Sequence, residues 1–257
     1  MKLYETYPAE WEEIPEITAY IPAEKKCNGA VVIFPGGAYR GRAAHEGKGY
    51  AEFLQSKGIC AFDVAYRVSP HRFPLELLDA RRAVRWVRAH AEEYGIDKNK
   101  IAVMGSSAGG HLAAMVSTYI DPIEFEGLDA VDAEDYLPNA QILCYPVIGN
   151  PTDCWFAHKG SYLNLLGSTD ADARMKVDPL LNANKTTPQA FIWHTAADVG
   201  VNMENSLRYA SVLHRFEIPV ELHIFPDGGH GLGLAEKLPH TAQWTGLLVN
   251  WLHKIFA

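Results

Sequence analysis

Short, continuous apolar runs alternate along this chain with segments whose apolar residues recur every three or four positions. The continuous runs are typical of strands in a parallel sheet that is buried on both faces, and the periodic segments are typical of the helices that cover such a sheet. This alternation predicts right-handed crossovers and a mostly parallel α/β sheet with helices on both faces. The expected strands are 30–34, 59–66, 101–104, 141–145, 190–195 and 220–225, with an edge strand over 18–21.

The periodic segments predict the helices. One helix is expected over 47–57 and ends at Gly58, and another over 73–94 ends at Gly95. A run of small residues continues as a helix to about residue 119, and a further helix is expected over 204–216. The clearest pattern is a C-terminal stripe typical of a helix that docks on a sheet: Trp244, Leu247, Leu248, Trp251, Leu252 and Ile255.

Two excursions interrupt the alternation, and we expect both to act as a partial cap. Residues 121–138 carry seven carboxylates whose scattered spacing lacks the pattern of a calcium loop, which favours a solvated surface insertion. Residues 147–184 are too long for a simple connection, and insertions at the carboxyl edge of a sheet commonly cover a site. We also expect a solvated face for four arginines of the 73–94 helix, Arg81, Arg82, Arg85 and Arg88.

Length and composition restrict the class of protein. The 257 residues suffice for one large α/β domain, so a single domain over 1–257 is expected. A net charge of −8 argues against a nucleic-acid partner or an anionic membrane. No run approaches the roughly 20 apolar residues of a membrane span. The N-terminus lacks the pattern of a signal peptide, so a cytoplasmic protein is expected.

The cysteines indicate neither a metal site nor a disulfide framework. They are Cys27, Cys60, Cys144 and Cys154, and none forms a C-x-x-C pair or a spacing with histidine that suits a metal. Three of them lie in or beside apolar runs. Buried, reduced thiols are therefore expected.

The segment Gly105-Ser-Ser-Ala-Gly109 follows an apolar strand and precedes a helix-like run. Its G-x-S-x-G spacing suits a nucleophile elbow, in which Ser107 occupies a sharp turn with its hydroxyl exposed. The two flanking glycines would let strand and helix approach closely there. The pattern alone is also compatible with an ordinary Gly/Ser turn, so its interpretation depends on partner residues.

Two such partners follow later strands. Asp198 lies just past strand 190–195, and His230 follows strand 220–225, so both would reach the same edge of the sheet as Ser107. The order Ser, Asp, His is that of an α/β-hydrolase triad, in which imidazole accepts the serine proton and carboxylate orients the imidazole. Each residue alone also fits a structural role. Asp227 is a rival for the acid.

Four motifs in order resemble the α/β-hydrolase esterases of the hormone-sensitive-lipase-like group, and within it small bacterial carbohydrate acetyl esterases. They lie at 35–39, 105–113, 194–198 and 228–232. The resemblance implies that the N–H groups of Gly37, Ala38 and Ala108 form an oxyanion hole. Pro35 and Ala38 depart from the family's His-Gly-Gly-Gly pattern without removing backbone donors, and Asn202 stands where relatives often have proline. No metal or organic cofactor is implied.

These observations predict a serine carboxylesterase that forms an acyl-enzyme on Ser107 and removes short acyl groups, above all acetyl groups, from carbohydrates. A small-molecule ester, such as an acetylated oligosaccharide, is the expected partner, and a homo-oligomer is compatible with the sequence. Candidate sugar-binding rings are Tyr39, Trp155, Phe156 and Tyr162, which could equally pack the second excursion. A serine peptidase or amidase on this fold, or a noncatalytic binding protein, remains an alternative.

Overall fold

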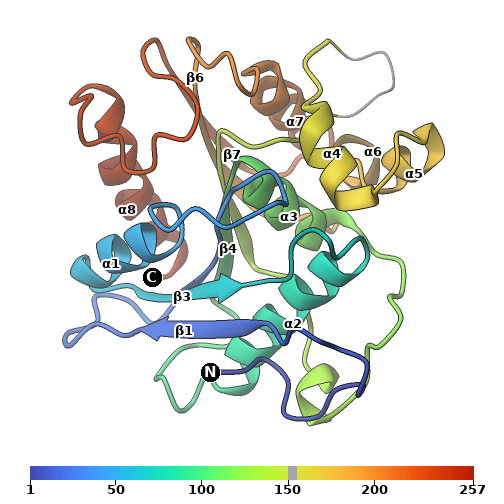
Figure 1. Cartoon of the computed structure of the whole chain (residues 1–257). Coiled ribbons are helices and arrows are strands. Elements are labelled where there is room, and N and C mark those ends of the chain that lie inside the picture. The colour runs from blue at the N-terminus through green and yellow to red at the C-terminus, as the bar shows by residue number, and fades with distance from the viewer. Residues whose placement is uncertain (150–154) are drawn as a thin grey trace.

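A computed structural model describes residues 1–149 and 155–257 and contains a seven-stranded sheet (Figure 1). The strand order is β1-β3-β2-β4-β5-β6-β7, in which β1 is an antiparallel edge strand and the other neighbours are parallel. This confirms the predicted mostly parallel sheet. The strands are β1 (Glu16–Tyr20), β2 (Ala30–Phe34), β3 (Cys60–Ala65), β4 (Ile101–Ser106), β5 (Ala140–Cys144), β6 (Gln189–Thr195) and β7 (Val220–Phe225).

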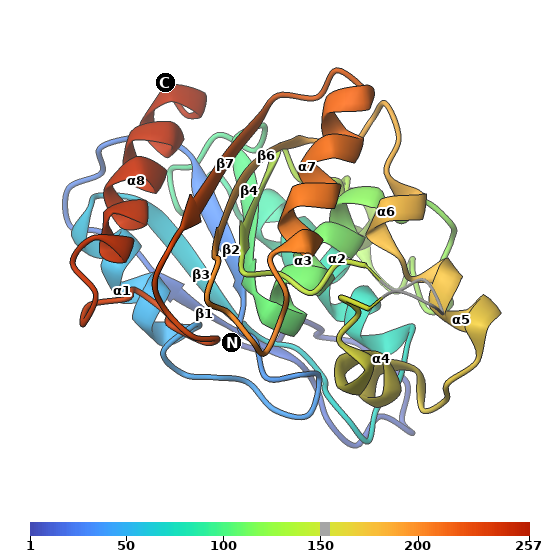
Figure 2. The ribbon, with the colours of Figure 1, turned by 90° about the horizontal axis from the view of Figure 1, so that it is seen from above.

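Helices cover both faces of the sheet (Figure 2). Helices α1 and α8 pack on one face, and α2, α3 and α7 pack on the other. The second excursion adds three short helices beside α3 and α7. The helices are α1 (Lys48–Ser56), α2 (Leu75–Ala89), α3 (Ser107–Thr118), α4 (Lys159–Leu166), α5 (Ala171–Lys176), α6 (Pro179–Asn182), α7 (Glu204–Arg215) and α8 (Trp244–Ile255), with 3₁₀ turns η1 (Ala130–Ala133) and η2 (Thr241–Gln243).

Strand β2 shows why its sequence is apolar at every position. Val31 and Ile33 belong to the core cluster under α1 and α8, whereas Val32 and Phe34 belong to the cluster under α2 and α3. Side chains alternate between the faces of a strand, so a sheet covered on both sides buries every residue. The continuous apolar run therefore reflects the central position of β2 in the sheet.

The acidic excursion does not contribute to a cap. Helix α3 begins at the carboxyl end of β4 and runs back along the sheet, so residues 119–139 connect its far end to the start of β5. They therefore lie at the amino ends of the parallel strands, whereas Ser107 lies at the carboxyl ends. This connectivity corrects the expectation that residues 121–138 cover the site.

The same segment corrects the expectation of a solvated arginine face on α2. Arg82 is 1% exposed and donates to Asp129 at 2.6 Å and to Asp132 at 2.9 Å. Glu126 accepts hydrogen bonds from both Arg81 and Arg85. A buried guanidinium needs a paired carboxylate, and the acidic excursion supplies these partners about 40 to 50 residues farther along the chain.

The structure describes three of the four cysteines, and all three are free thiols. Burial raises the pKa of Cys60 to about 11 and that of Cys144 to about 12, so both are protonated near neutral pH. Cys154 lies outside the described residues.

Within the described part of the chain, no helix combines the length and the apolar character that crossing a bilayer requires.

Candidate active site

Ser107 occupies the sharp junction between β4 and α3, with a positive φ of 53°. The flanking glycines make this turn sterically feasible. A Cβ at Gly105 would lie 2.0 Å from the carbonyl oxygen of Gly109, and a Cβ at Gly109 would lie 2.0 Å from that of Phe34. No larger residue fits these contacts. The predicted strand, turn and helix are therefore present, and the turn carries the backbone strain that is common at functional sites.

His230 connects Ser107 to Asp198. The His230 Nε2 atom lies 2.7 Å from Ser107 Oγ, and its Nδ1 atom lies 2.7 Å from Asp198 Oδ2. An ionised carboxylate only accepts, so Nδ1–H donates to it and Nε2 accepts from the serine hydroxyl. The structure thus brings together the three residues that the sequence singled out. The rival Asp227 instead accepts a hydrogen bond from Thr241 through its backbone carbonyl.

Asp198 is held by more contacts than the sequence revealed. Its Oδ1 atom accepts from the N–H groups of Gly200 and Val201, at 2.8 and 2.9 Å. The Nε2 atom of His194 lies 3.3 Å from Oδ2 and 2.8 Å from the carbonyl oxygen of Val201, so this nitrogen carries the proton. Burial alone would raise the pKa of Asp198, but the hydrogen bonds from His194, His230 and Val201 outweigh it and hold the pKa well below its usual range.

The loop after β2 has an unusual backbone. Gly37, Ala38 and Tyr39 have φ values of 141°, 54° and 57°. Among the described residues, no acceptor pairs with the backbone N–H of Gly37 or Ala38. The N–H of Ala108 lies in the first turn of α3, where helices leave donors without intrahelical acceptors. These three groups are the predicted oxyanion-hole donors, and the loop geometry is compatible with that role.

Hydrogen bonds from several segments hold this loop in place. The Gly36 N–H donates to Glu46 Oε2 at 3.0 Å, and the Ser69 N–H donates to the Tyr39 carbonyl at 2.8 Å. From helix α4, the Asn164 side-chain amide donates to the Ala38 carbonyl at 2.8 Å. Left-handed backbone at non-glycine residues costs energy and persists only where neighbouring contacts fix it. The second excursion therefore lies beside the candidate site and supports its loop.

A cavity of about 280 Å³ opens at Ser107 and His230. Its wall includes His158 and Glu46, which sequence reasoning did not single out. The N–H of Ser161 donates to His158 Nδ1 at 3.3 Å, so in the neutral ring Nε2 carries the proton and is a donor. Burial, together with the nearby His230, lowers the pKa of His158 and favours this neutral form. No local sequence motif marks this histidine.

Glu46 belongs to a buried polar network behind the cavity. Its Oε1 atom accepts from the Tyr145 hydroxyl at 2.7 Å, and that hydroxyl accepts from the N–H of Gly233 at 2.9 Å. The Tyr145 ring lies edge-on to His230, with centroids 5.2 Å apart. The network therefore joins the loop after β2 to the loop that carries His230.

Most of the predicted sugar-binding rings are buried. Tyr39 and Tyr162 are 1% and 2% exposed, and both pack edge-on against the His111 ring, with ring centroids 5.8 and 5.1 Å from it. Phe156 is also buried. This burial corrects the expectation that these three rings present their faces to a sugar, because packing already occupies those faces. Trp155 is 70% exposed, and its role in binding remains a prediction.

His111 explains why Tyr39 and the second excursion are joined. Its Nε2 atom lies 2.8 Å from the carbonyl of Val177, so Nε2 donates, and its Nδ1 atom accepts from the Tyr39 hydroxyl at 2.7 Å. Burial lowers the pKa of His111 to about 4, which keeps the ring neutral.

Within residues 1–149 and 155–257, no group of three or more His, Cys, Asp or Glu side chains is arranged to hold a metal ion.

The chain is similar to known proteins over most of its length. The model of the BD-FAE family matches residues 17–213. Endo-1,4-beta-xylanase B of Butyrivibrio fibrisolvens is 34% identical over 93% of this chain, and an acetylxylan esterase of Xylanibacter ruminicola is 30% identical over 93%. The matched regions are 38% and 48% of those two proteins. The chain therefore spans less than half the length of these curated relatives.

A solved structure matches nearly the whole fold. The acetyl ester-xyloside bifunctional hydrolase from Caldicellulosiruptor lactoaceticus superimposes with a TM-score of 0.90 at 39% identity. The match covers 99% of this chain and 95% of that one. Together with the sheet order, this likeness confirms the predicted α/β-hydrolase fold.

Proposed function

This chain belongs to the BD-FAE family, and on that basis we propose that it is a serine esterase that removes acetyl groups from carbohydrates. The observation that carries the proposal is the hydrogen-bonded series Ser107, His230 and Asp198, with both links at 2.7 Å. A serine hydroxyl is a weak nucleophile near neutral pH, and this series supplies both the base and the group that orients the base.

In the first half-reaction, Ser107 Oγ attacks the acyl carbon while His230 Nε2 takes the hydroxyl proton. The carbonyl oxygen becomes an oxyanion that the N–H groups of Gly37, Ala38 and Ala108 stabilise, a term worth a few kcal/mol per donor in comparable sites. The bond to the leaving oxygen then breaks, and that oxygen takes the proton from His230. The alcohol departs and the acyl group remains on Ser107.

In the second half-reaction, water attacks the acyl carbon and gives its proton to His230. Collapse of the second tetrahedral intermediate releases the carboxylic acid and returns the proton to Ser107. Asp198 stays ionised throughout, because its hydrogen bonds hold its pKa low, and it stabilises the imidazolium that forms in each half-reaction.

The cavity and the relatives support the proposed substrate. A space of about 280 Å³ bounded by Ala38, Ala43 and His158 favours a small acyl group. The relative from Xylanibacter ruminicola is an acetylxylan esterase, and the solved relative is an acetyl ester-xyloside hydrolase. We therefore propose an acetylated saccharide, such as an acetylated xylo-oligosaccharide, as the substrate. Bulk lipid is disfavoured, because neither excursion carries a long apolar face.

The test combines an active-site label with a substrate panel. A fluorophosphonate probe should label the wild-type protein and leave Ser107→Ala unlabelled. We expect hydrolysis of p-nitrophenyl acetate and of acetylated xylo-oligosaccharides, with turnover falling sharply by the octanoate ester. Absence of labelling would favour a binding protein, and faster cleavage of amides than of matched esters would favour a peptidase or amidase.

A further inference from the structure

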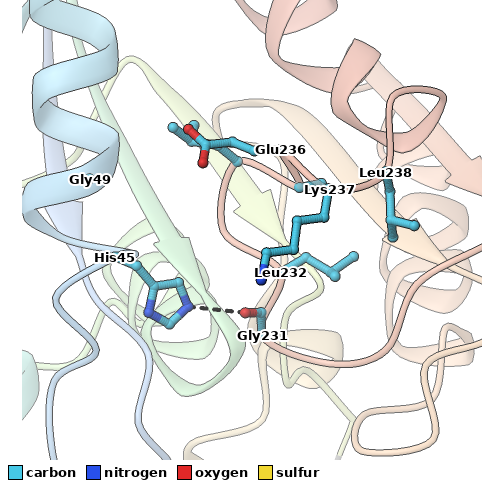
Figure 3. Close-up of a pocket in the computed structure, with 9 residues that line it drawn as sticks. His45, Gly49, Gly231, Leu232, Glu236, Lys237 and Leu238 are labelled. Carbon is cyan, nitrogen blue, oxygen red and sulfur yellow. Dashed lines mark hydrogen bonds between the residues drawn. The ribbon is translucent and has the colours of Figure 1, made fainter.

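A second cavity, of about 480 Å³, lies between α1 and the loop that follows His230 (Figure 3). This volume is within the range of small-molecule sites. Gly49 of α1 lies on one side, and residues 231–238 curve around the other. None of the mechanistic steps above uses this space.

The second cavity adjoins the one that contains Ser107. His45 and Gly231 line both of them. The His45 Nε2 atom lies 3.0 Å from the carbonyl oxygen of Gly231, so Nε2–H donates across the boundary (Figure 3). Because Nε2 carries the proton in the neutral ring, Nδ1 is left as an acceptor. The two cavities are thus adjacent, and the hydrogen-bonded pair His45 and Gly231 lies between them.

The chemistry decides which part of an ester lies toward this boundary. The carbonyl oxygen must face the N–H groups of Gly37 and Ala38, and the leaving oxygen must receive its proton from His230 Nε2. The alcohol moiety therefore leaves the reacting carbon on the side of His230. Gly231, which follows His230 directly, forms the start of the second cavity on that side.

The lining has two kinds of group. Leu232 and Leu238 provide apolar surface. The Lys237 ammonium provides a donor, and the His45 ring and the Glu236 carboxylate provide acceptors (Figure 3). A sugar ring likewise has C–H surfaces and a rim of hydroxyl groups, each able to donate and accept. Lys237 is exposed, so it can reach a hydroxyl without leaving a buried charge unpaired.

We propose that this cavity is a glycosyl subsite that binds the sugar unit next to the one whose acetyl group is removed. The inference rests on the proposed function, because it extends the alcohol moiety of the same ester. It predicts that the enzyme distinguishes acetylated oligosaccharides from acetylated monosaccharides, through a contact that p-nitrophenyl acetate is too short to make.

Gly49 offers a way to fill the cavity without disturbing the backbone. A Cβ at this position would meet nothing closer than 3.9 Å, and its φ is not in the left-handed region. The helical position also favours most residues, phenylalanine and alanine included, over glycine. Gly49→Phe should fill the space, and Gly49→Ala serves as the matched small variant. Gly246→Phe is the second control, because Gly246 lies in α8, a Cβ there would meet no atom within 4 Å, and Gly246 lines neither cavity.

The readout is the ratio of kcat/KM for acetylated xylotriose to kcat/KM for acetylated xylose. We expect a ratio of about ten or more in the wild type, Gly49→Ala and Gly246→Phe, and a ratio near one in Gly49→Phe. The kcat/KM for p-nitrophenyl acetate should stay within about twofold in all four proteins. Because the ratio compares two substrates of one protein, partial loss of folded enzyme does not change it.

Other outcomes separate the two proposals. A wild-type ratio near one, or the wild-type ratio retained in Gly49→Phe, overturns the glycosyl subsite and leaves the acetyl esterase proposal intact. Hydrolysis of p-nitrophenyl acetate without hydrolysis of any acetylated sugar overturns the carbohydrate substrate and with it the subsite.

Discussion

The side-chain amide of Asn164 donates a hydrogen bond of 2.8 Å to the backbone carbonyl of Ala38. Asn164 belongs to the second excursion, whereas Ala38 is one of the candidate oxyanion donors, 126 residues earlier in the chain. This contact fixes a peptide group whose flanking residues have left-handed backbone angles. We therefore regard Asn164 as a positioning residue that acts through Ala38.

Asn164→Ala should lower kcat for p-nitrophenyl acetate by about 10- to 100-fold, because a small misplacement of a catalytic group has effects of this size. KM should change little, since Asn164 does not line the cavity at Ser107. The matched control is Asn182→Ala, which removes a hydrogen bond to the Lys176 carbonyl within the same excursion. Equal losses in the two variants would show that Asn164 acts only through the stability of the excursion.

Ser107→Ala should reduce turnover by about 10³-fold or more, because it removes the proposed nucleophile. Ser106→Ala is the control: Ser106 is fully buried, and its hydroxyl pairs with that of Tyr50 at 2.9 Å rather than with His230. Steady-state kinetics with p-nitrophenyl acetate measures both. If Ser106→Ala is inactive and Ser107→Ala is active, the nucleophile has been assigned to the wrong residue.

Asp198→Asn should reduce kcat by about 10⁴-fold, because an amide leaves His230 in the wrong tautomer. Asp227→Asn should keep most of the activity, since the Asp227 contact to Thr241 uses its backbone carbonyl. The same assay compares the two variants. A mild effect at Asp198 beside a severe one at Asp227 would reverse the assignment of the acid.

Asp132→Ala should lower the free energy of unfolding by about 2 kcal/mol, because it removes one of the two carboxylates that pair with the buried guanidinium of Arg82, while Asp129 remains. Turnover at 25 °C should not change, since the pair lies at the opposite edge of the sheet from Ser107. Glu134→Ala, which breaks a long and partly exposed pair with Lys98, should cost less than about 1 kcal/mol. Urea unfolding measures both; similar costs would contradict the view that burial makes the Arg82 pair important.

Glu76→Gln tests a buried acid in α2. Burial raises the pKa of Glu76 to about 8, and among the described residues its carboxylate oxygens have no hydrogen-bond partner beyond a weak contact with its own backbone N–H. Between about pH 4.5 and 8 the unfolded chain has lost this proton while the folded chain keeps it, so stability falls as pH rises through this window.

The glutamine variant lacks this titration. Its gain in melting temperature over the wild type should therefore be small at pH 5 and largest at pH 8 to 9, as calorimetry or thermal denaturation would measure. A gain that is the same at both pH values would show that Glu76 does not titrate in this range.

The sequence predicted the elements whose signal is local. Continuous apolar runs marked the buried strands, and the stripe from Trp244 to Ile255 marked α8. The candidate triad was predicted too, since strand ends that share one edge of a sheet bring together residues as distant as Ser107 and His230. Order along the chain was enough to identify these three positions.

Contacts between segments that lie far apart in the chain could not be predicted from the sequence. Arg82 looked solvated because its partner Asp132 lies 50 residues away, in a segment without periodicity. His158 and Glu46 line the cavity without belonging to any motif. Tyr39 and Tyr162 were expected to bind substrate, because aromatic residues in loops serve both packing and recognition. The position of His111 shows that these two rings serve packing.

The acidic excursion packs on α2 at the amino ends of the strands, whereas the loops that reach Ser107 leave from the carboxyl ends. The buried ion pairs therefore share no residue with the cavity at Ser107. For protein engineering this separation provides two independent starting points. Heat tolerance can be improved through charges at one edge, while the proposed active site is redesigned at the other, and no residue is shared between the two sets of changes.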